Sequence, residues 1–269
     1  MYKAVFLDMD GTLLRKDHTV SEETKVVIDQ LTKGGVPVTL VSARPVHAIM
    51  PTFYRLGLPE HAPLVSLNGS YIVEAGEPIF QSAIDLDTTE AVARQVRPYG
   101  ATITYYVQQE WFSETRDRWT DHEQRITDVP LRVAALPELI SEWSERGISP
   151  NKMMIMSEAE AIAQTQTDLK NIYGGRLNIY PSKPTFLEVM EPRGSKSNAV
   201  KFLIDRMNLD RTEIIAMGDN YNDREMIEFA GMGVAMGNAP DAIKAVAGYV
   251  TDTNNNDGVR LALEKFFDL

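Results

Sequence analysis

The sequence contains no cysteine, which excludes disulfide bonds, a catalytic thiol and a metal site built from thiolates. Positive charge is also scarce, because 27 Lys and Arg stand against 38 Asp and Glu, giving a formal net charge of -11. A nucleic-acid-binding surface needs clustered basic side chains, so no nucleic-acid partner is expected. An anionic substrate must therefore be held by local positive groups or by a metal ion.

Long apolar runs are missing as well. No run approaches the 18 residues that indicate a membrane-spanning helix, and the first residues lack the basic flank and apolar stretch of a signal peptide. We therefore expect no membrane partner and a cytoplasmic protein. The 269 residues are 43% hydrophobic, which is enough for one large domain or for two smaller ones with separate cores.

The segment that organises the chain lies at its start. An apolar run over residues 4–7 ends in Asp8 and Asp10, and Gly11 follows with the freedom to make a tight turn. This pattern predicts a buried parallel strand, and in open α/β sheets ligands bind outside the carboxyl ends of such strands. A polar strand end that only caps a turn is the alternative, because Asp-x-Asp-Gly is common in loops.

Two carboxylates one residue apart also suggest a division of labour. Asp8 and Asp10 could share one face of the strand, because side chains alternate in direction along it. One carboxylate could attack phosphorus as a nucleophile, which splits a difficult hydrolysis into two easier steps. The other could protonate the leaving oxygen and then activate water.

The next segment repeats this order of elements. A helix that Ser21 would cap should stop at Gly34, and a second apolar run ends at Ser42. A strand, a helix and a strand imply a right-handed crossover with two adjacent parallel strands, so Ser42 should lie near Asp8. Ser42 could donate to a phosphate oxygen or could cap the helix expected at 46–56, and the sequence leaves both open.

Further strand-to-loop transitions follow. A third apolar run ends in the turn pair Asn68-Gly69, and a hairpin is expected around Ala75-Gly76. Near the C-terminus, the segments at Gly237-Asn238 and at 254–258 are expected to line the same sheet edge.

From about Ile84 the pattern changes, because strand ends no longer carry clusters of acids or hydroxyls. We expect an inserted α+β domain whose helices cover one face of a sheet. Its expected elements include a helix capped by residues 87–90, a half-buried strand over 102–107 and a helix with a full capping box at 157–160. The expected division of the chain is a core of residues 1–83 and 189–269 with an insert of residues 84–188.

The insert is rich in aromatic and basic residues. They could line a pocket for an organic phosphate, or the aromatics could pack between sheet and helix while the arginines face solvent. The residues concerned are Tyr105, Tyr106, Trp111, Phe112, Arg116, Arg118, Trp119, His122 and Arg125.

Two clusters near the C-terminal side complete the set. Lys196 is expected near the start of a helix, where its ammonium could pair with Asp8 and then with a phosphoryl group, although a solvent-exposed lysine is the alternative. The apolar run before Gly218 leads directly into Asp219, Asn222 and Asp223. Mg²⁺ prefers a few carboxylate oxygens together with water and substrate phosphate oxygens, and two strand-end loops can supply such a site.

These four segments, taken in order, resemble the motifs of the haloacid dehalogenase-like superfamily of phosphatases. Asp8–Thr12 resembles the first motif, Ser42 the second, Lys196 the third and residues 218–223 the fourth. The insert resembles the large α/β cap of the Cof-type subfamily. The resemblance implies an α/β fold with a Rossmann-like core, a mainly parallel sheet and an inserted α+β cap, and Mg²⁺-dependent hydrolysis of phosphomonoesters through an aspartyl-phosphate.

The resemblance also implies residue roles. Asp8 would be the nucleophile and Asp10 the general acid/base, and Mg²⁺ would be held by Asp8, the backbone carbonyl of Asp10 and Asp219. Asp223 would support the metal site without touching the ion. The phosphate would be held by the amide of Met9, Ser42, the amide of Ala43, Lys196 and Asn222. One position departs from the family pattern, since Ser42-Ala43-Arg44 stands where many relatives have Thr-Gly-Arg.

The expected partner is a small phosphorylated metabolite, such as a sugar phosphate, and the expected state is a monomer or a weak homodimer. A phosphomutase or phosphotransferase with the same intermediate is an alternative, as is a non-catalytic sensor of a phosphorylated ligand. The four residues Asp8, Asp10, Lys196 and Asp219 argue against the sensor, because binding alone needs neither a nucleophile nor a general acid.

Overall fold

The computed structural model describes residues 2–267 and 269, and the chain divides into two compact units. We call them the core unit and the insert unit. The core unit comprises Met1–Ala43, Ile49–Ile79 and Ser195–Leu269, and the insert unit comprises Arg44–Ala48 and Phe80–Gly194.

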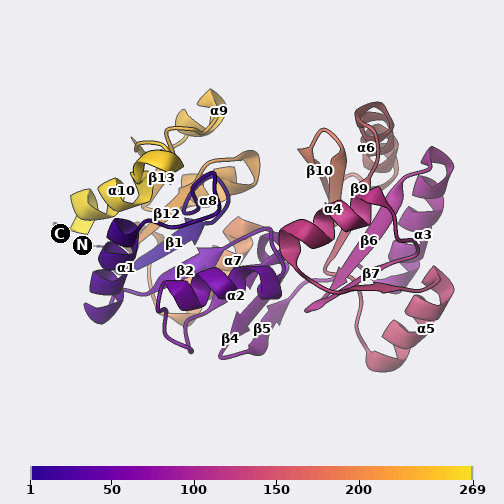
Figure 1. Ribbon diagram of the computed structural model, residues 1–269, viewed down its shortest axis with the longest axis horizontal. Helices are drawn as coiled ribbons and strands as arrows, with labels where there is room; N and C mark the ends of the chain where they lie inside the picture. The colour runs from indigo at the N-terminus through magenta and orange to yellow at the C-terminus, as the bar shows by residue number, and fades with distance from the viewer. Residues whose placement is uncertain (1, 268) are drawn as a thin grey trace. The chain divides into compact units, whose positions relative to one another are not determined.

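The core unit contains an eight-stranded sheet in the order β14-β13-β12-β1-β2-β3-β4-β5 (Figure 1). Strands β14 to β3 run parallel, and β4 is antiparallel to β3. The strands are β1 (Ala4–Asp8), β2 (Val38–Val41), β3 (Leu64–Ser66), β4 (Tyr71–Glu74), β5 (Glu77–Gln81), β12 (Ile214–Gly218), β13 (Met232–Ala235) and β14 (Tyr249–Val250). The helices are α1 (Glu22–Lys33), α2 (Val46–Arg55), α7 (Lys196–Arg206), α8 (Arg224–Phe229), α9 (Asp241–Lys244) and α10 (Gly258–Phe267).

Strand β1 lies between β2 and β12 and is parallel to both. All residues of these three strands are buried, which explains why the sequence shows continuous apolar runs there rather than alternation. Asp8 is in register with Val41, and Leu7 with Met217. The loops after β1, β2 and β12 therefore leave the sheet on the same side, at the carboxyl ends of these strands. The predicted α/β fold with a mainly parallel sheet is confirmed.

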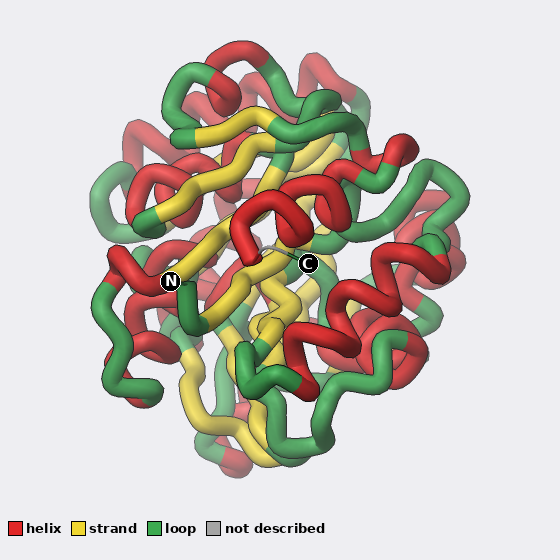
Figure 2. Tube along the Cα trace, turned by 90° about the vertical axis from the view of Figure 1, so that its left-hand side faces the viewer, coloured by secondary structure: helices red, strands yellow, loops and turns green. Residues whose placement is uncertain are grey.

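Local signals in the core unit act as predicted. The Ser21 side chain accepts a hydrogen bond from the Thr24 amide at 3.1 Å, and α1 ends at Gly34. Helices α1 and α10 pack together, and the Tyr2 ring meets Phe266 edge-on with centroids 6.0 Å apart. These contacts bring the N-terminal and C-terminal segments to the same region of the unit (Figure 2).

The insert unit contains a six-stranded sheet in the order β10-β11-β9-β6-β7-β8. Its strands pair antiparallel except β7 and β8, which are parallel. The strands are β6 (Thr102–Val107), β7 (Glu110–Ser113), β8 (Leu131–Val133), β9 (Lys152–Met156), β10 (Asn178–Lys183) and β11 (Phe186–Met190). The helices are α3 (Leu86–Val96), α4 (Arg118–Thr127), α5 (Leu136–Arg146) and α6 (Ala159–Tyr173).

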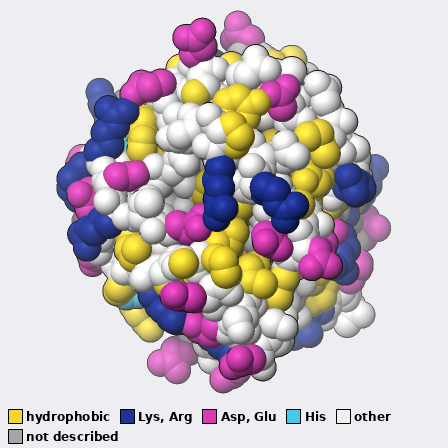
Figure 3. Space-filling view, turned by 90° about the vertical axis from the view of Figure 1, so that its right-hand side faces the viewer, with side chains coloured by type: hydrophobic (Ala, Val, Ile, Leu, Met, Phe, Trp, Pro, Cys, Tyr) yellow, Lys and Arg dark blue, Asp and Glu magenta, His cyan; other side chains and the backbone are white. Residues whose placement is uncertain are grey.

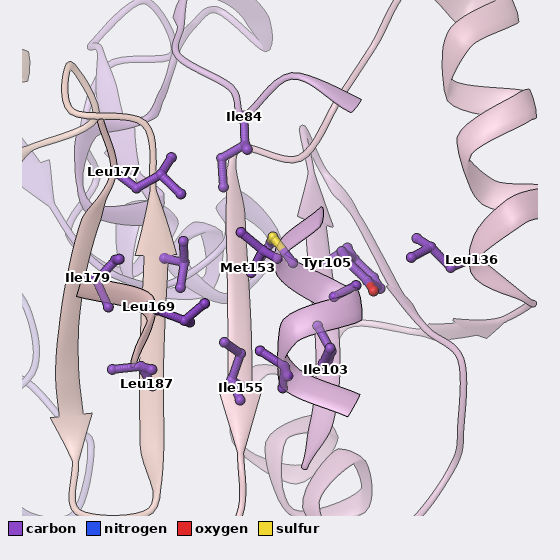
Figure 4. Packing of buried hydrophobic residues seen from close by; sticks show 14 of the residues in the cluster. Ile84, Ile103, Tyr105, Leu136, Met153, Ile155, Leu169, Leu177, Ile179 and Leu187 are labelled. Atoms are coloured by element: carbon purple, nitrogen blue, oxygen red, sulfur yellow. The ribbon is translucent and has the colours of Figure 1, made fainter. Parts of the chain in front are cut away.

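Helices α3, α5 and α6 cover one face of this sheet and share a hydrophobic core with it (Figure 4). Ile103 and Tyr105 of β6 point into this core, as does Ile155 of β9. The Trp143 ring of α5 meets Tyr105 at a centroid distance of 5.5 Å and Phe112 at 5.3 Å, both in edge-on geometry.

A helix also packs on the second face of this sheet, so the prediction that the helices cover one face was wrong. Helix α4 packs against β6, and the Tyr106 hydroxyl donates to the Glu123 carboxylate at 2.8 Å. Strand β6 is consequently buried on both faces rather than half-buried. The sequence did not indicate this contact, because the residues that α4 buries, Thr120, Glu123 and Thr127, are polar.

Two predicted helix caps in the insert unit were also wrong. Helix α3 is capped by Asp85, whose carboxylate accepts from the Thr88 amide at 2.8 Å, rather than by residues 87–90. Helix α6 begins after Glu158 without a side-chain cap. Ser157 cannot start the expected capping box, because its amide donates to the Thr185 carbonyl and extends the sheet pairing.

Four aromatic residues of the aromatic-rich segment pack inside the insert unit, as the second of the two interpretations predicts. Tyr105, Tyr106, Trp111 and Phe112 are fully buried, and the Tyr106 and Trp111 rings stack at 5.9 Å, so these side chains belong to the packing of the insert unit. The face of the molecule seen in Figure 3 intersperses basic and acidic side chains rather than showing a patch of one sign. Among the described residues, no helix has both the length and the apolarity to span a membrane.

Candidate active site

A buried lysine lies between two buried carboxylates in the core unit. Lys196 is the first residue of α7, and its Nζ lies 2.5 Å from Oδ1 of Asp8 and 2.6 Å from Oδ1 of Asp223. The three side chains are at most 6% exposed. Lys196 is therefore not the solvent-exposed lysine of the alternative interpretation. A buried ammonium is stable only when it is paired, and here it is paired with two carboxylates.

Burial and the neighbouring charges shift the pKa values of Asp8 and Lys196. Burial raises the pKa of Asp8 well above its usual range, and the nearby Asp223 raises it further while Lys196 opposes both. Burial lowers the pKa of Lys196, but the carboxylates of Asp223 and Asp8 outweigh this effect and raise it overall. Lys196 therefore stays positively charged at neutral pH.

Asp223 is held by several donors at once. In addition to Lys196, it accepts the backbone amides of Asp219 and Asn220 at Oδ2, at 3.0 and 2.9 Å. A Cβ on Gly218 would lie 2.3 Å from the Cβ of Asp223, so only glycine fits there. With both its oxygens used in this way, Asp223 is suited to fixing the loop and the lysine rather than to binding an ion.

Asp219 lies at the end of β12, next to the turn that follows β1. Its Oδ1 accepts from the Thr12 hydroxyl at 3.1 Å. A Cβ on Gly11, which has a φ of 82°, would lie 2.3 Å from Asp219 Oδ2, so this close approach also requires glycine. Burial raises the pKa of Asp219 to about 6, with a further contribution from Asp223.

These groups fit a magnesium ion. Carboxylate oxygens of Asp8, Asp219 and Asp223 lie within 4.8 Å of one another, and hard oxygen ligands are those that Mg²⁺ prefers. Lys196 supplies one positive charge against these three carboxylates. A divalent cation would offset the remainder, and Asp8 and Asp219 are the carboxylates best placed to hold it.

The predicted phosphate-binding residues lie on loops at the same edge. Ser42 follows β2 and is buried, and its backbone is fixed by its amide donating to Val65 and its carbonyl accepting from Asn68, both at 2.9 Å. Asn222 Nδ2 donates to Asn68 Oδ1 at 3.0 Å. Asn68 thus links two predicted phosphate-binding residues from neighbouring loops.

Asn68 belongs to the candidate site, but the sequence predicted it only as part of a turn. Its φ of 56° places it in the left-handed region, which asparagine tolerates better than most residues. The signal was present in the turn pair Asn68-Gly69 directly after a strand, but only the structure shows that the turn aims its side chain at Asn222.

The remaining predicted residues differ in their surroundings. Met9 is buried and accepts the Leu14 amide at 2.8 Å through its carbonyl, which closes the loop after β1. Asp10 belongs to the same loop, but its side chain is exposed. Ala43 directly follows Ser42 and is half-buried. The structure thus brings Asp8, Lys196, Asp219 and Asp223 together, with the other predicted residues on adjoining loops.

The chain is similar to known proteins over nearly its whole length. The family model for haloacid dehalogenase-like hydrolases matches residues 5–263. A putative phosphatase of Haemophilus influenzae is 38% identical over 272 residues, covering 99% of both chains. The 5-amino-6-(5-phospho-D-ribitylamino)uracil phosphatase of Bacillus subtilis is 26% identical, covering 98% of this chain and 97% of the relative.

A solved structure shows the same fold. The crystal structure of a haloacid dehalogenase-like hydrolase from Bacteroides thetaiotaomicron superposes with a TM-score of 0.89 at 29% identity, covering 99% of this chain and 100% of that one.

Proposed function

Because the chain belongs to the haloacid dehalogenase-like hydrolase family and is a phosphatase, we propose that it hydrolyses small phosphomonoesters with Mg²⁺, through a phosphoryl group carried on Asp8. The observation that supports this proposal is the buried contact of Lys196 with Asp8 and Asp223, beside Asp219. Such a site provides a nucleophile, a fixed positive charge and oxygen ligands within a few ångströms.

In the first half-reaction, a carboxylate oxygen of Asp8 attacks phosphorus and the bond to the ester oxygen breaks. Asp10, on the exposed side of the same loop, donates a proton to the leaving oxygen. In the second half-reaction, Asp10 takes a proton from water, the water oxygen bonds to phosphorus, and phosphate leaves with Asp8 restored.

Binding of the phosphate is assigned to groups on three loops and at the start of α7. Lys196 pairs with Asp8 in the free enzyme and would neutralise phosphoryl oxygens in the complex. Ser42 and Asn222 would donate to other phosphoryl oxygens, with Asn68 fixing the position of Asn222. The amides of Met9 and Ala43 would complete the set.

The metal site is assigned to Asp8, Asp219 and the carbonyl of Asp10, with Asp223 orienting the loop. Mg²⁺ bound there would stabilise negative charge on the phosphoryl oxygens as it develops. Removal of the ion by a chelator is therefore expected to abolish turnover.

The proposed substrate class is small organic phosphate esters. The name of the Bacillus subtilis relative describes a phosphorylated ribityl compound, which supports a small organic phosphate ester as substrate. We assign selection of the organic group to the insert of residues 84–188, because contacts remote from the reacting bond can provide specificity.

A screen of phosphorylated metabolites tests this proposal. The protein is assayed for phosphate release with Mg²⁺, with chelator and as the Asp8→Asn variant. Release that requires both Mg²⁺ and Asp8 supports it, and release that survives either loss contradicts it. Product analysis separates hydrolysis from the phosphomutase or phosphotransferase alternative, since only hydrolysis yields free phosphate at the rate at which the ester disappears.

A further inference from the structure

Asn238 connects the two loops that carry the proposed metal ligands. It lies in the loop after β13, and its Nδ2 donates to the Gly11 carbonyl at 2.8 Å and, in a longer contact, to Asp219 Oδ2 at 3.4 Å. Gly11 belongs to the loop of Asp8 and Asp10, whereas Asp219 follows β12. One amide group therefore bridges segments that are more than 200 residues apart in the sequence.

The orientation of this amide is fixed by its third partner. The backbone amide of Asn254 donates to Asn238 Oδ1 at 2.9 Å, so the oxygen must face Asn254. The NH₂ group then faces Gly11 and Asp219, both of which are acceptors. The reverse orientation would place an oxygen against two acceptors and an NH₂ group against a donor, and is therefore disfavoured.

The loop at 254–257, which contacts Asn238, is itself held in place. The loop at 254–257 holds the segment that follows Gly11 through three contacts: Asn254 Nδ2 with the Leu14 carbonyl at 2.8 Å, Asn255 Oδ1 with the Lys16 amide at 2.9 Å, and Asp257 with Arg15 at 2.7 Å. The segment 11–16 and the loop 254–257 therefore form one connected network, with Asn238 at the end nearest Asp219.

The two oxygens of Asp219 are thereby held from two directions. Thr12 donates to Oδ1 and Asn238 to Oδ2. A ligand carboxylate that is already oriented loses less conformational freedom when it binds a cation, and the groups that orient such ligands affect metal affinity strongly.

We propose that Asn238 is a positioning residue for the metal site, holding the Asp219 carboxylate and the Gly11 turn in the arrangement that binds Mg²⁺. This inference rests on the proposed function, because it concerns the same site. It adds a residue that touches neither the phosphate nor the ion.

Mg²⁺ binding, measured by isothermal titration calorimetry on the full chain without substrate, tests this inference. Asn238→Ala removes the donors, and Asn238→Leu removes them while keeping a side chain of similar size. Asn256→Ala is the matched control, because Asn256 is exposed in the same region and donates to Asp252 instead. The Asn238 variants are expected to bind Mg²⁺ about ten-fold more weakly, and the control to bind it like the unmodified protein.

Two further readouts separate positioning from a general structural role. The rise in melting temperature on adding Mg²⁺ should shrink in the Asn238 variants, while their melting temperature without metal stays close to that of the unmodified protein. Phosphatase activity should fall at low Mg²⁺ and recover at saturating Mg²⁺.

Unchanged Mg²⁺ affinity in both Asn238 variants would overturn the inference and leave the proposed function intact. Loss of cooperative melting in both would also overturn it, because Asn238 would then be needed for folding. Failure of the unmodified protein to bind Mg²⁺ would instead contradict the proposed function.

Discussion

Gly69 packs directly against Ser195, so closely that a Cβ on Gly69 would lie 2.2 Å from the Ser195 carbonyl oxygen. Ser195 is the N-cap of α7, the helix that begins with Lys196. The turn after β3 thus sets the position of the helix that delivers the buried lysine to Asp8. This contact explains why the sequence has glycine immediately after Asn68.

Gly69→Ala is expected to destabilise the protein by roughly 2 kcal/mol or more and to lower phosphatase activity, because it combines a φ of 92° with a backbone clash. Gly76→Ala is the matched control, since Gly76 has a φ of 82° but nothing within 4 Å of the added Cβ. Urea unfolding of both variants checks this. Equal losses of unfolding free energy would show that the clash with Ser195 is unimportant.

Lys196→Met is expected to abolish activity and to lower the free energy of unfolding by about 3 kcal/mol or more, because it leaves the buried carboxylates of Asp8 and Asp223 without their cation. Lys201→Met makes the same change on an exposed position of α7 and should cost less than about 1 kcal/mol. Denaturant titrations in metal-free buffer measure both. Similar stability of the two variants would contradict the buried pairing.

The stability of the metal-free protein should depend on pH through Asp219. Its pKa in the folded protein, about 6, lies above the usual 3.8, so the stability linked to this group is present below pH 3.8 and is lost as the pH rises through about 6. Asp8 should act in the same direction, since burial also raises its pKa.

Thermal melts between about pH 4 and about pH 7 test this expectation, with Asp219→Asn as the reference for all other groups. The unmodified protein should lose more stability than this variant over that range, and Mg²⁺ should reduce the loss because it favours the ionised carboxylates. If the stability of the two proteins changed with pH in the same way, with and without Mg²⁺, an excess of negative charge at the site would be contradicted.

Asp10→Asn is expected to slow hydrolysis of alkyl phosphates about 10²- to 10³-fold, and that of aryl phosphates with good leaving groups much less. The reason is that only a poor leaving oxygen needs a proton from Asp10. Rates across a series of leaving groups measure the difference. A uniform loss across the series would remove Asp10 from the role of general acid.

Much of the core unit could be predicted from the sequence because its signals are local. The apolar run at residues 4–7, the Ser21 cap and the glycines after α1 each act through neighbouring residues, and parallel topology then brings the strand ends to one edge. The contact of Lys196 with Asp8 followed from that placement.

What the sequence could not provide depends on contacts between distant segments. Helix α4 packs on the second face of its sheet through Tyr106 and Glu123, and the residues that α4 buries are polar, so the sequence does not indicate this contact. Asn68 and Asn238 have hydrogen-bond partners more than 150 residues away, so their own segments mark turns but do not show what the side chains contact.

The central claim is that Asp8 carries the phosphoryl group during turnover. Its most direct test is acid quenching of the protein during reaction with a substrate and Mg²⁺, followed by mass spectrometry of the peptide that contains Asp8. We predict one added phosphoryl group on Asp8 that hydroxylamine removes, and none in Asp8→Asn, which should be folded but inactive. Turnover at full rate by Asp8→Asn, or a phosphoryl group on another residue, would contradict the account.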